Sequence, residues 1–449
     1  TSMKRKWFLS AAATVLTLLL TGCTPLKMDA PTLMKPPKTT AEKQEIYQVL
    51  EEKAGAQMTL RYPKAGEYRS AIIMKDVTGD GNEEALAFYT KGDESFTFLS
   101  VISEVGGVWQ EIANFQSPAV QIDRVCFGDF SGNGVTDFAV GWGSSAAGTA
   151  ELSLYTSAEG TVKEISTKEF YSELAVLELD EASGKSALVT VRQKTKDWHA
   201  IAKVFGILNG NVNLMDTVAL DPEVTKYNKV TVAKIDANHT GILLDSATSA
   251  RVFQTEILYW EKSGASLRNP LYFSGEKNYT LRAAAIASQD INGDGIAEIP
   301  ITHGLPGEFT EDAPDTAYAV NWHRYDMSTN TFTNLLSTVV NSRDGYMMIL
   351  PEAWRDNITT EQNAEQASLS FYQWRRAADA TESGSRGELL LRIYVMTQEQ
   401  WNAQAETTQL HKLKQHSNIV FAAELPQTQS ELGLTLQETE QYFKIFTQG

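Results

Sequence analysis

The chain has 449 residues, of which 42% are hydrophobic and 10% aromatic, so it is long enough for two or three domains with real cores. Its 39 basic against 56 acidic residues give a net charge of −17, which argues against the clustered basic surface that nucleic-acid binding requires. The only cysteines are Cys23 and Cys126, so a disulfide scaffold is excluded as well.

The first residues have the layout of a secretory signal. Thr1 and Ser2 precede a natural-looking start at Met3, after which three basic residues lead into an apolar run from Trp7 to Leu20 that is too short for a permanent membrane span. The run ends in Leu20-Thr21-Gly22-Cys23, which resembles the lipobox of bacterial lipoproteins. The resemblance implies that residues 1–22 are a signal peptide, that Cys23 carries the lipid, and that the protein is held on the extracytoplasmic face of the cell membrane. The alternative is a plain signal peptide with a chance cysteine.

Cleavage before Cys23 would leave 36 basic against 56 acidic residues, a net charge of −20. Anionic headgroups repel such a body, so we expect acyl chains and not a basic patch to hold it at the membrane. Residues 24–38 contain four prolines among small and polar residues, which predicts a flexible tether over 23–38. Thr39 and Glu42 then form a capping box that predicts a helix through about Ala54.

One loop motif occurs three times along the chain, as Asp76–Glu84, Asp129–Asp137 and Asp290–Glu298. Two degenerate copies of the motif begin at Asp180 and Asp236, so that the five starting aspartates are 53, 51, 56 and 54 residues apart. A turn follows in phase with each copy. These turns lie at Gly107, Gly160, Gly210, Gly264 and Asn330.

Each period contains four strand-like segments, two around the Asp-Gly loop and two around the turn. Four-stranded units at this spacing are typical of propeller blades, because a single sheet buries both faces only when its neighbours stack around an axis. We therefore predict a mainly β protein: a β-propeller of five four-stranded blades, with six or seven as alternatives, over residues 39–340 together with the N-terminal helix. A segment at Met58–Tyr62 is expected to close the ring onto the last blade. Two unrelated β-sandwiches would not explain the phased repeats.

The repeated loop resembles the FG-GAP and VCBS repeats over about residues 60–340. The residues that carry the resemblance are the starting aspartate, the two glycines and the acidic ninth position, followed by an alternating apolar strand. The resemblance implies a propeller whose loops commonly hold calcium. It does not imply one function, since such repeats serve adhesion, binding and enzyme scaffolds alike.

The loops also offer the oxygen ligands that calcium prefers, at positions 1, 3, 5 and 9, with a backbone carbonyl at position 7. An EF-hand would need an acidic residue at position 12, where this chain has Ala87, Val140 and Ile301. The alternative is that the loops are Asx turns without metal. The candidate ligands are Asp76, Thr78, Asp80, Asn82 and Glu84; Asp129, Ser131, Asn133 and Asp137, a weaker set with one carboxylate fewer; and Asp290, Asn292, Asp294, Ile296 and Glu298. The two degenerate copies lack the acidic ninth residue and are expected to hold no metal.

No catalytic motif is present: the six histidines have no metal-ligand spacing, and neither a nucleophile elbow nor a P-loop occurs. Cys126 lies in an apolar segment and is expected to be an inert buried thiol. A long insertion in the fifth period is a candidate ligand loop, against the alternative of a solvated acidic loop. Trp142, before the Gly-Ser-rich stretch 143–148, is a second candidate. The insertion carries Glu308, Phe309, Glu311 and Asp312.

Beyond about residue 340 the repeat stops, and mixed helical and strand patterns predict a small α+β domain over 341–449. The sequence as a whole indicates a lipid-anchored, cell-surface binding or scaffold protein with a calcium-stabilised propeller and a protein or glycan ligand. The alternative is an extracytoplasmic hydrolase acting on cell-wall or polysaccharide substrates at the propeller mouth, because paired carboxylates can come from distant parts of the chain.

Overall fold

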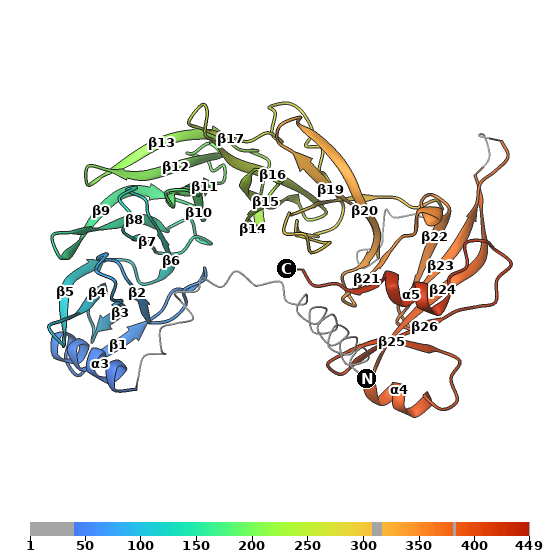
Figure 1. Cartoon of the computed structure of the whole chain (residues 1–449), viewed down its shortest axis with the longest axis horizontal. Coiled ribbons are helices and arrows are strands. Elements are labelled where there is room, and N and C mark those ends of the chain that lie inside the picture. The colour runs from blue at the N-terminus through green and yellow to red at the C-terminus, as the bar shows by residue number, and fades with distance from the viewer. Residues whose placement is uncertain (1–39, 308–316, 380–382, 449) are drawn as a thin grey trace, which may run out of the picture.

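The computed structural model describes residues 40–307, 317–379 and 383–448. This part of the chain is mainly β, and its strands form six antiparallel sheets. In Figure 1 the sheets follow one another around an arc in chain order, with the C-terminus on the inner side of the arc. None of the helices among the described residues is long and apolar enough to cross a membrane.

The first four sheets each arise from one period of the repeat, and their strands pair mostly in sequence order. The first sheet contains β1 (Met58–Arg61), β2 (Ile72–Lys75), β3 (Glu84–Lys91), β4 (Thr97–Val105) and β5 (Val108–Ser117). The second contains β6 (Ile122–Gly128), β7 (Asp137–Trp142), β8 (Glu151–Ala158) and β9 (Thr161–Phe170). The third contains β10 (Glu173–Asp180), β11 (Lys185–Arg192), β12 (Ile201–Leu208) and β13 (Asn211–Ala219). The fourth contains β14 (Lys226–Lys234), β15 (Thr240–Ser249), β16 (Val252–Glu261) and β17 (Ser266–Arg268).

The last two sheets contain the remaining strands, and some of their neighbouring strands are not consecutive in the chain. The fifth contains β18 (Ile299–His303), β19 (Tyr318–Asp326), β20 (Thr331–Asn341), β21 (Tyr346–Ile349) and, from the C-terminus, β27 (Phe443–Ile445). The sixth contains β22 (Ile358–Asn363), β23 (Ser368–Arg375), β24 (Ser385–Thr397), β26 (Ile419–Glu424) and β25 (His411–His416). The helical elements here are η1 (Glu352–Trp354), α4 (Gln398–Gln404) and α5 (Leu436–Tyr442). Because β20 pairs with β21, the fifth sheet extends across the expected domain boundary at residue 340.

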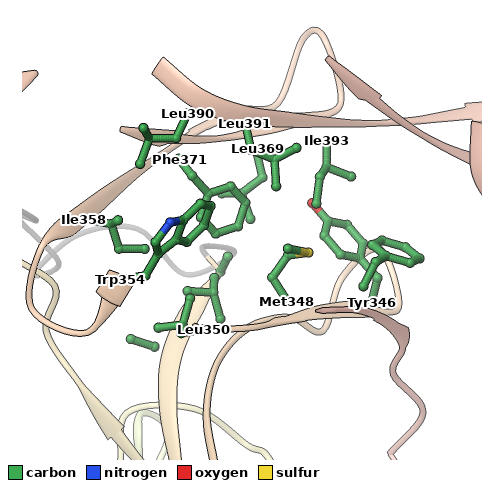
Figure 2. Close-up of a cluster of buried hydrophobic side chains, with 14 of the residues drawn as sticks. Tyr346, Met348, Leu350, Trp354, Ile358, Leu369, Phe371, Leu390, Leu391 and Ile393 are labelled. Atoms are coloured by element: carbon green, nitrogen blue, oxygen red, sulfur yellow. The ribbon is translucent and has the colours of Figure 1, made fainter. Parts of the chain in front are cut away.

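The sheets pack face to face, and each neighbouring pair shares a hydrophobic cluster. This packing explains why β3 and β7 are apolar along most of their length: both faces of these strands are covered, and almost every side chain is buried. Figure 2 shows the cluster between the fifth and sixth sheets, where Met348 and Trp354 meet Phe371 and Leu391. The C-terminal sheet therefore packs on the repeat instead of standing apart from it.

The outer face of the first sheet is covered by a helix, α3 (Thr40–Ala54), which lies where the capping box predicts one. Its Ile46 and Leu50 pack on Ala85 and Tyr89 of β3. The expected role of Met58–Tyr62 is wrong: β1 pairs with β3 inside the first sheet and does not join a last blade. Among the described residues, no strand of the first sheet pairs with a strand of the sixth.

Candidate functional site

The Asp-Gly loops and the in-phase turns lie at one end of the sheets. The loops at Asp76 and Asp129 connect the strands β2–β3 and β6–β7, and the turns connect β4–β5, β8–β9, β12–β13, β16–β17 and β19–β20. In an antiparallel sheet with sequential strands, alternate connections lie at the same end. The connections β5–β6 and β7–β8 therefore lie at the opposite end. The structure thus offers two separate places for a site.

The starting aspartate of each loop binds the loop's own backbone. The two carboxylate oxygens of Asp76 accept hydrogen bonds from the N–H groups of Gly79, at 2.7 Å, and Gly81, at 2.9 Å. Both glycines have positive φ angles, of 80° and 89°, which explains why glycine occupies these two positions. The same pair of contacts recurs at Asp129 with Gly132 and Gly134, and at Asp290 with Gly293 and Gly295.

The acidic ninth residue also holds the loop, from inside the protein. Glu84 is fully buried and accepts hydrogen bonds from the N–H groups of Val77 and Thr78 and from the Ser103 hydroxyl. Burial raises its pKa, against the opposing effect of these donors. Asp137 and Glu298 are equally buried and accept from the N–H groups of Ser131 and Ile291. These contacts give the first and ninth positions a structural role whether or not a cation is bound.

An arginine occupies the acidic side of the third loop. Nη2 of Arg324, from β19, lies 2.6 Å from a carboxylate oxygen of Asp294 and 2.5 Å from one of Glu298. It supplies the positive charge that a metal ion would otherwise bring to these two carboxylates. Within the described residues, no lysine or arginine pairs in this way with Asp76, Asp80 or Glu84 of the first loop.

The first loop has one further feature that fits a cation. The Thr78 hydroxyl oxygen is buried and has no hydrogen-bond partner in the part of the chain that the structure describes. An unsatisfied buried oxygen at position 3 is what a calcium ligand would be before the ion binds. Across the described ranges, however, the side chains of His, Cys, Asp and Glu form no preorganised group of three or more around a metal position.

The two degenerate copies of the loop form turns, and one of them contains a histidine. Asp236 accepts hydrogen bonds from the N–H groups of Asn238 and His239, from ring Nδ1 of His239 at 2.7 Å, and from the N–H of Met327 in the fifth sheet. These contacts tie the fourth sheet to the fifth. They also orient His239, which lines a pocket of about 710 Å³ with Tyr259.

A second place for a site is a pocket of about 660 Å³ at the opposite end, between the first and second sheets. It is formed by the end of β5 and the β5–β6 connection, residues 116–121, and by the β7–β8 connection that follows Trp142. We call it the Trp142 pocket. It also contains Glu151, Ser153, Glu164 and Ser166 from β8 and β9. The structure thus places Trp142 and much of the 143–148 stretch in one cavity.

A chain of hydrogen bonds fixes the aromatic wall of this pocket. The Trp142 indole N–H donates to the Tyr155 hydroxyl at 3.1 Å, and that hydroxyl donates to Glu164 at 2.7 Å. Burial and the Glu164 carboxylate raise the pKa of Tyr155, so the phenol keeps its proton. The Trp142 wall of the pocket is therefore held in place by hydrogen bonds between protein side chains.

The glycine-rich connection is anchored from behind by Asp123 of β6. Both the N–H and the hydroxyl of Ser145 donate to Asp123 Oδ1, while Tyr171 and Arg124 donate to Oδ2. Burial alone would raise the pKa of Asp123, but these partners hold it below its ordinary value. Arg124 also pairs with Glu173 of the third sheet at 3.1 Å. The connection after Trp142 is thus held in place by the buried carboxylate of Asp123.

Sequence reasoning missed Asp123, Glu151 and Glu164, because nothing in their local pattern separates them from ordinary strand residues. Cys126 is only partly buried among its neighbours, and desolvation raises the pKa of its thiol to about 11, which suits an unreactive group. The remaining candidates, Cys23 with the signal and tether, and Glu308, Phe309, Glu311 and Asp312 of the insertion, lie outside the described residues.

Comparisons with known proteins identify no family for this chain. No protein-family model matches it, and no curated protein is similar to it. Among solved structures, a protein from Lactobacillus plantarum matches with a TM-score of 0.27 and 7% identity, over 74% of this chain and 95% of that one.

Two further solved structures are similar at the same level. The Dos1 propeller matches with a TM-score of 0.28 and 9% identity, over 69% of this chain and 65% of that one. The exotype rhamnogalacturonan lyase YesX matches with a TM-score of 0.29 and 12% identity, over 75% of this chain and 63% of that one. This chain thus spans less than two thirds of the length of either protein. At these TM-scores the matches carry no conclusion about its activity.

Proposed function

We propose that this protein is a lipid-anchored, extracytoplasmic binding protein whose ligand, a glycan or peptide, occupies the Trp142 pocket. The observation that carries the proposal is the pocket itself: about 660 Å³, with a rigid indole wall and a ring of amide, hydroxyl and carboxylate groups. Its size and its mixture of an aromatic wall with a few polar groups suit a small organic ligand or one segment of a polymer.

The alternative, hydrolysis in this same pocket, has less support. The two carboxylates come from Glu151 and Glu164, and Glu164 is paired across the hairpin with Tyr155, four residues beyond Glu151. Four residues of strand span about 13 Å. The two carboxylates of glycoside hydrolases lie about 5–9.5 Å apart. Glu164 is also held by Tyr155, which limits its reach.

One observation favours a hydrolase at the other end of the sheets. Asp236 holds Nδ1 of His239, which leaves Nε2 as the ring nitrogen available as a general base toward its pocket. If a cell-wall or polysaccharide fragment were turned over, and His239→Gln removed that turnover, the hydrolase would replace the binding protein as the better account.

We expect Trp142→Ala to weaken binding of a cell-wall glycan or peptide fragment by at least about tenfold, measured by calorimetric titration. The indole forms one wall of the pocket, and its removal also frees Tyr155 and Glu164. Because Trp142 is buried, Gln121→Ala at the pocket rim is the companion variant, with a weaker effect expected and little loss of stability. Trp198→Ala, which removes an exposed tryptophan in the β11–β12 connection, is the control. Equal affinities for all four proteins would overturn the proposal.

We further propose that the six sheets are the blades of an open array with two capped ends, in place of a closed five-bladed ring. Helix α3 covers the face of the first sheet on which a last blade would pack. The outer face of the sixth sheet is polar, with Arg392 bonded to Glu424 at 3.1 Å and to Ser370 at 2.7 Å. Stacked repeats end in units with a polar or covered outer face, and both ends here have that character.

We propose that calcium stabilises mainly the first loop, because Arg324 already pairs with the carboxylates of the third loop. Extracellular calcium modules bind at about 10⁻⁴–10⁻³ M, so calcium at about ten times the dissociation constant should add about 1.4 kcal/mol to the free energy of unfolding. We expect Asp80→Ala to abolish this gain, while Asp294→Ala lowers stability equally with calcium and with chelator. Superimposable melting curves of the unmodified protein with calcium and with chelator would leave the loops as plain Asx turns.

Lipidation of Cys23 is the last part of the proposal. We expect Cys23→Ser to release the protein from the membrane fraction without changing its melting temperature, since only the thiol can take the lipid. Cell fractionation in high salt measures this directly. Cys126→Ser is the matched control and should remain with the membrane. Retention of the Cys23→Ser protein in the membrane fraction would refute the lipobox assignment.

A further inference from the structure

A groove of about 730 Å³ lies on the outer face of the first sheet, beside α3. Helix α3, at the N-terminal end of the arc in Figure 1, packs on β3 and β5 of this sheet. Because β2 pairs with the edge of β3 that faces away from β4, the helix covers the face of β2 less completely. We call the resulting space the Lys43 groove. It shares no lining residue with the Trp142 pocket.

The sheet side of the groove is apolar. Side chains of β2 alternate between its two faces: Ile73 is buried in the cluster shared with the second sheet, whereas Ile72 and Met74 lie on the α3 side and are only partly buried. Leu60 of β1 lines the same side and is also partly buried. An apolar surface that stays in contact with water favours an apolar ligand, because binding removes that surface from water.

The helix side of the groove carries one charge. Lys43, Gln44 and Tyr47 line it from α3, and Lys43 is the only ionised side chain among the described residues of the lining. Side chains three and four positions apart share a helix face, and those positions after Lys43 hold Ile46 and Tyr47, neither of which is acidic. Within the described part of the chain, Lys43 therefore forms no ion pair, and its ammonium group stands exposed at the rim.

A single cation beside an apolar surface is complementary to an anionic amphiphile. We propose that the Lys43 groove binds a free fatty acid: the carboxylate pairs with Lys43, and the acyl chain lies along Ile72 and Met74. A peptide in the same place would bring a backbone N–H and C=O at every residue, each of which needs a partner, whereas an acyl chain needs none. The volume and the mostly apolar lining also suit a small-molecule site. This site is separate from the proposed function of the Trp142 pocket.

Three probes test the charge and the chain separately, by calorimetric titration of the full chain below the concentration at which micelles form. They are decanoate, its uncharged analogue decanol, and the shorter hexanoate. We expect decanoate to bind and decanol to bind at least about tenfold more weakly, because it cannot pair with Lys43. Hexanoate should also bind at least about tenfold more weakly, because it buries fewer methylene groups.

Two variants remove the charge and the space. Lys43→Gln should weaken decanoate binding at least about tenfold and leave decanol binding unchanged. Ser70→Trp, which adds an indole at an exposed lining position, should weaken binding of both probes. Lys53→Gln, at an exposed lysine of the same helix outside the groove, is the control and should bind as the unmodified protein does.

Melting curves of the variants establish that they fold. The inference is overturned if decanoate fails to bind, if decanol binds equally well, or if Lys43→Gln and Ser70→Trp both bind like the Lys53→Gln control. It is also overturned if sedimentation shows a dimer that Ser70→Trp converts to a monomer, since a second copy of the chain would then occupy the groove. Glycan or peptide binding by the same variants reports on the Trp142 pocket, so failure of one site can be told apart from failure of the other.

Discussion

Glu256→Gln is expected to make the protein more stable at about pH 8, by as much as about 3 kcal/mol, and to flatten its stability between about pH 5 and 8. Glu256, on β16, is fully buried, and burial raises its pKa from an ordinary 4.5 to about 7. Its Oε1 accepts hydrogen bonds from Asn269 and from the N–H of Asp221, while Oε2 has no partner among the described residues. A glutamine oxygen can accept the same two bonds without a buried charge.

The direction of this pH dependence follows from the raised pKa of Glu256. The folded state favours protonated Glu256, so its contribution to stability is complete below about pH 4.5 and is lost as pH rises to about 7 and beyond. Urea unfolding at several pH values measures this loss. Glu261→Gln, which removes a partly exposed carboxylate on the same strand, is the control and should leave the profile between pH 6 and 8 unchanged. Parallel profiles for Glu256→Gln and the unmodified protein would contradict the prediction.

Arg282→Leu is expected to lower the free energy of unfolding by about 3–5 kcal/mol, because it leaves Asp245 charged and buried without its partner. The ion pair joins β15 to the segment that leads into the fifth sheet, so its loss should also loosen the contact between these sheets. Denaturant unfolding at neutral pH measures the effect.

The control for Arg282→Leu is an ion pair of the same sheet at the surface. Arg268 lies 2.7 Å from Glu261, and their side chains are 55% and 34% exposed. Removing such a pair changes stability by at most about 1 kcal/mol, so Arg268→Leu should have a small effect. Equal losses for the two variants would mean that burial of the Asp245–Arg282 pair has no energetic importance.

The local elements of this fold could be predicted from the sequence because their contacts lie close together in the chain. The starting aspartate of each loop binds N–H groups three and five residues later, and the glycines adopt positive φ angles that few other residues tolerate. The helix over 40–54 and the strands around each loop depend on equally local patterns. Mainly β structure in consecutive four-stranded sheets was therefore accessible from the repeat alone.

Tertiary structure decided how these units meet, because that depends on residues far apart in the chain. Only packing shows that α3 covers the first sheet, that β27 returns from the C-terminus to the fifth, and that Arg324 enters the loop at Asp290. The Trp142 pocket likewise needs two connections brought together at the ends of neighbouring sheets. Glu256 looks like any alternating strand residue, and only burial by neighbouring segments makes its charge unfavourable. Sequence determined the repeating unit, while burial between units determined the pockets and the charges that can act in them.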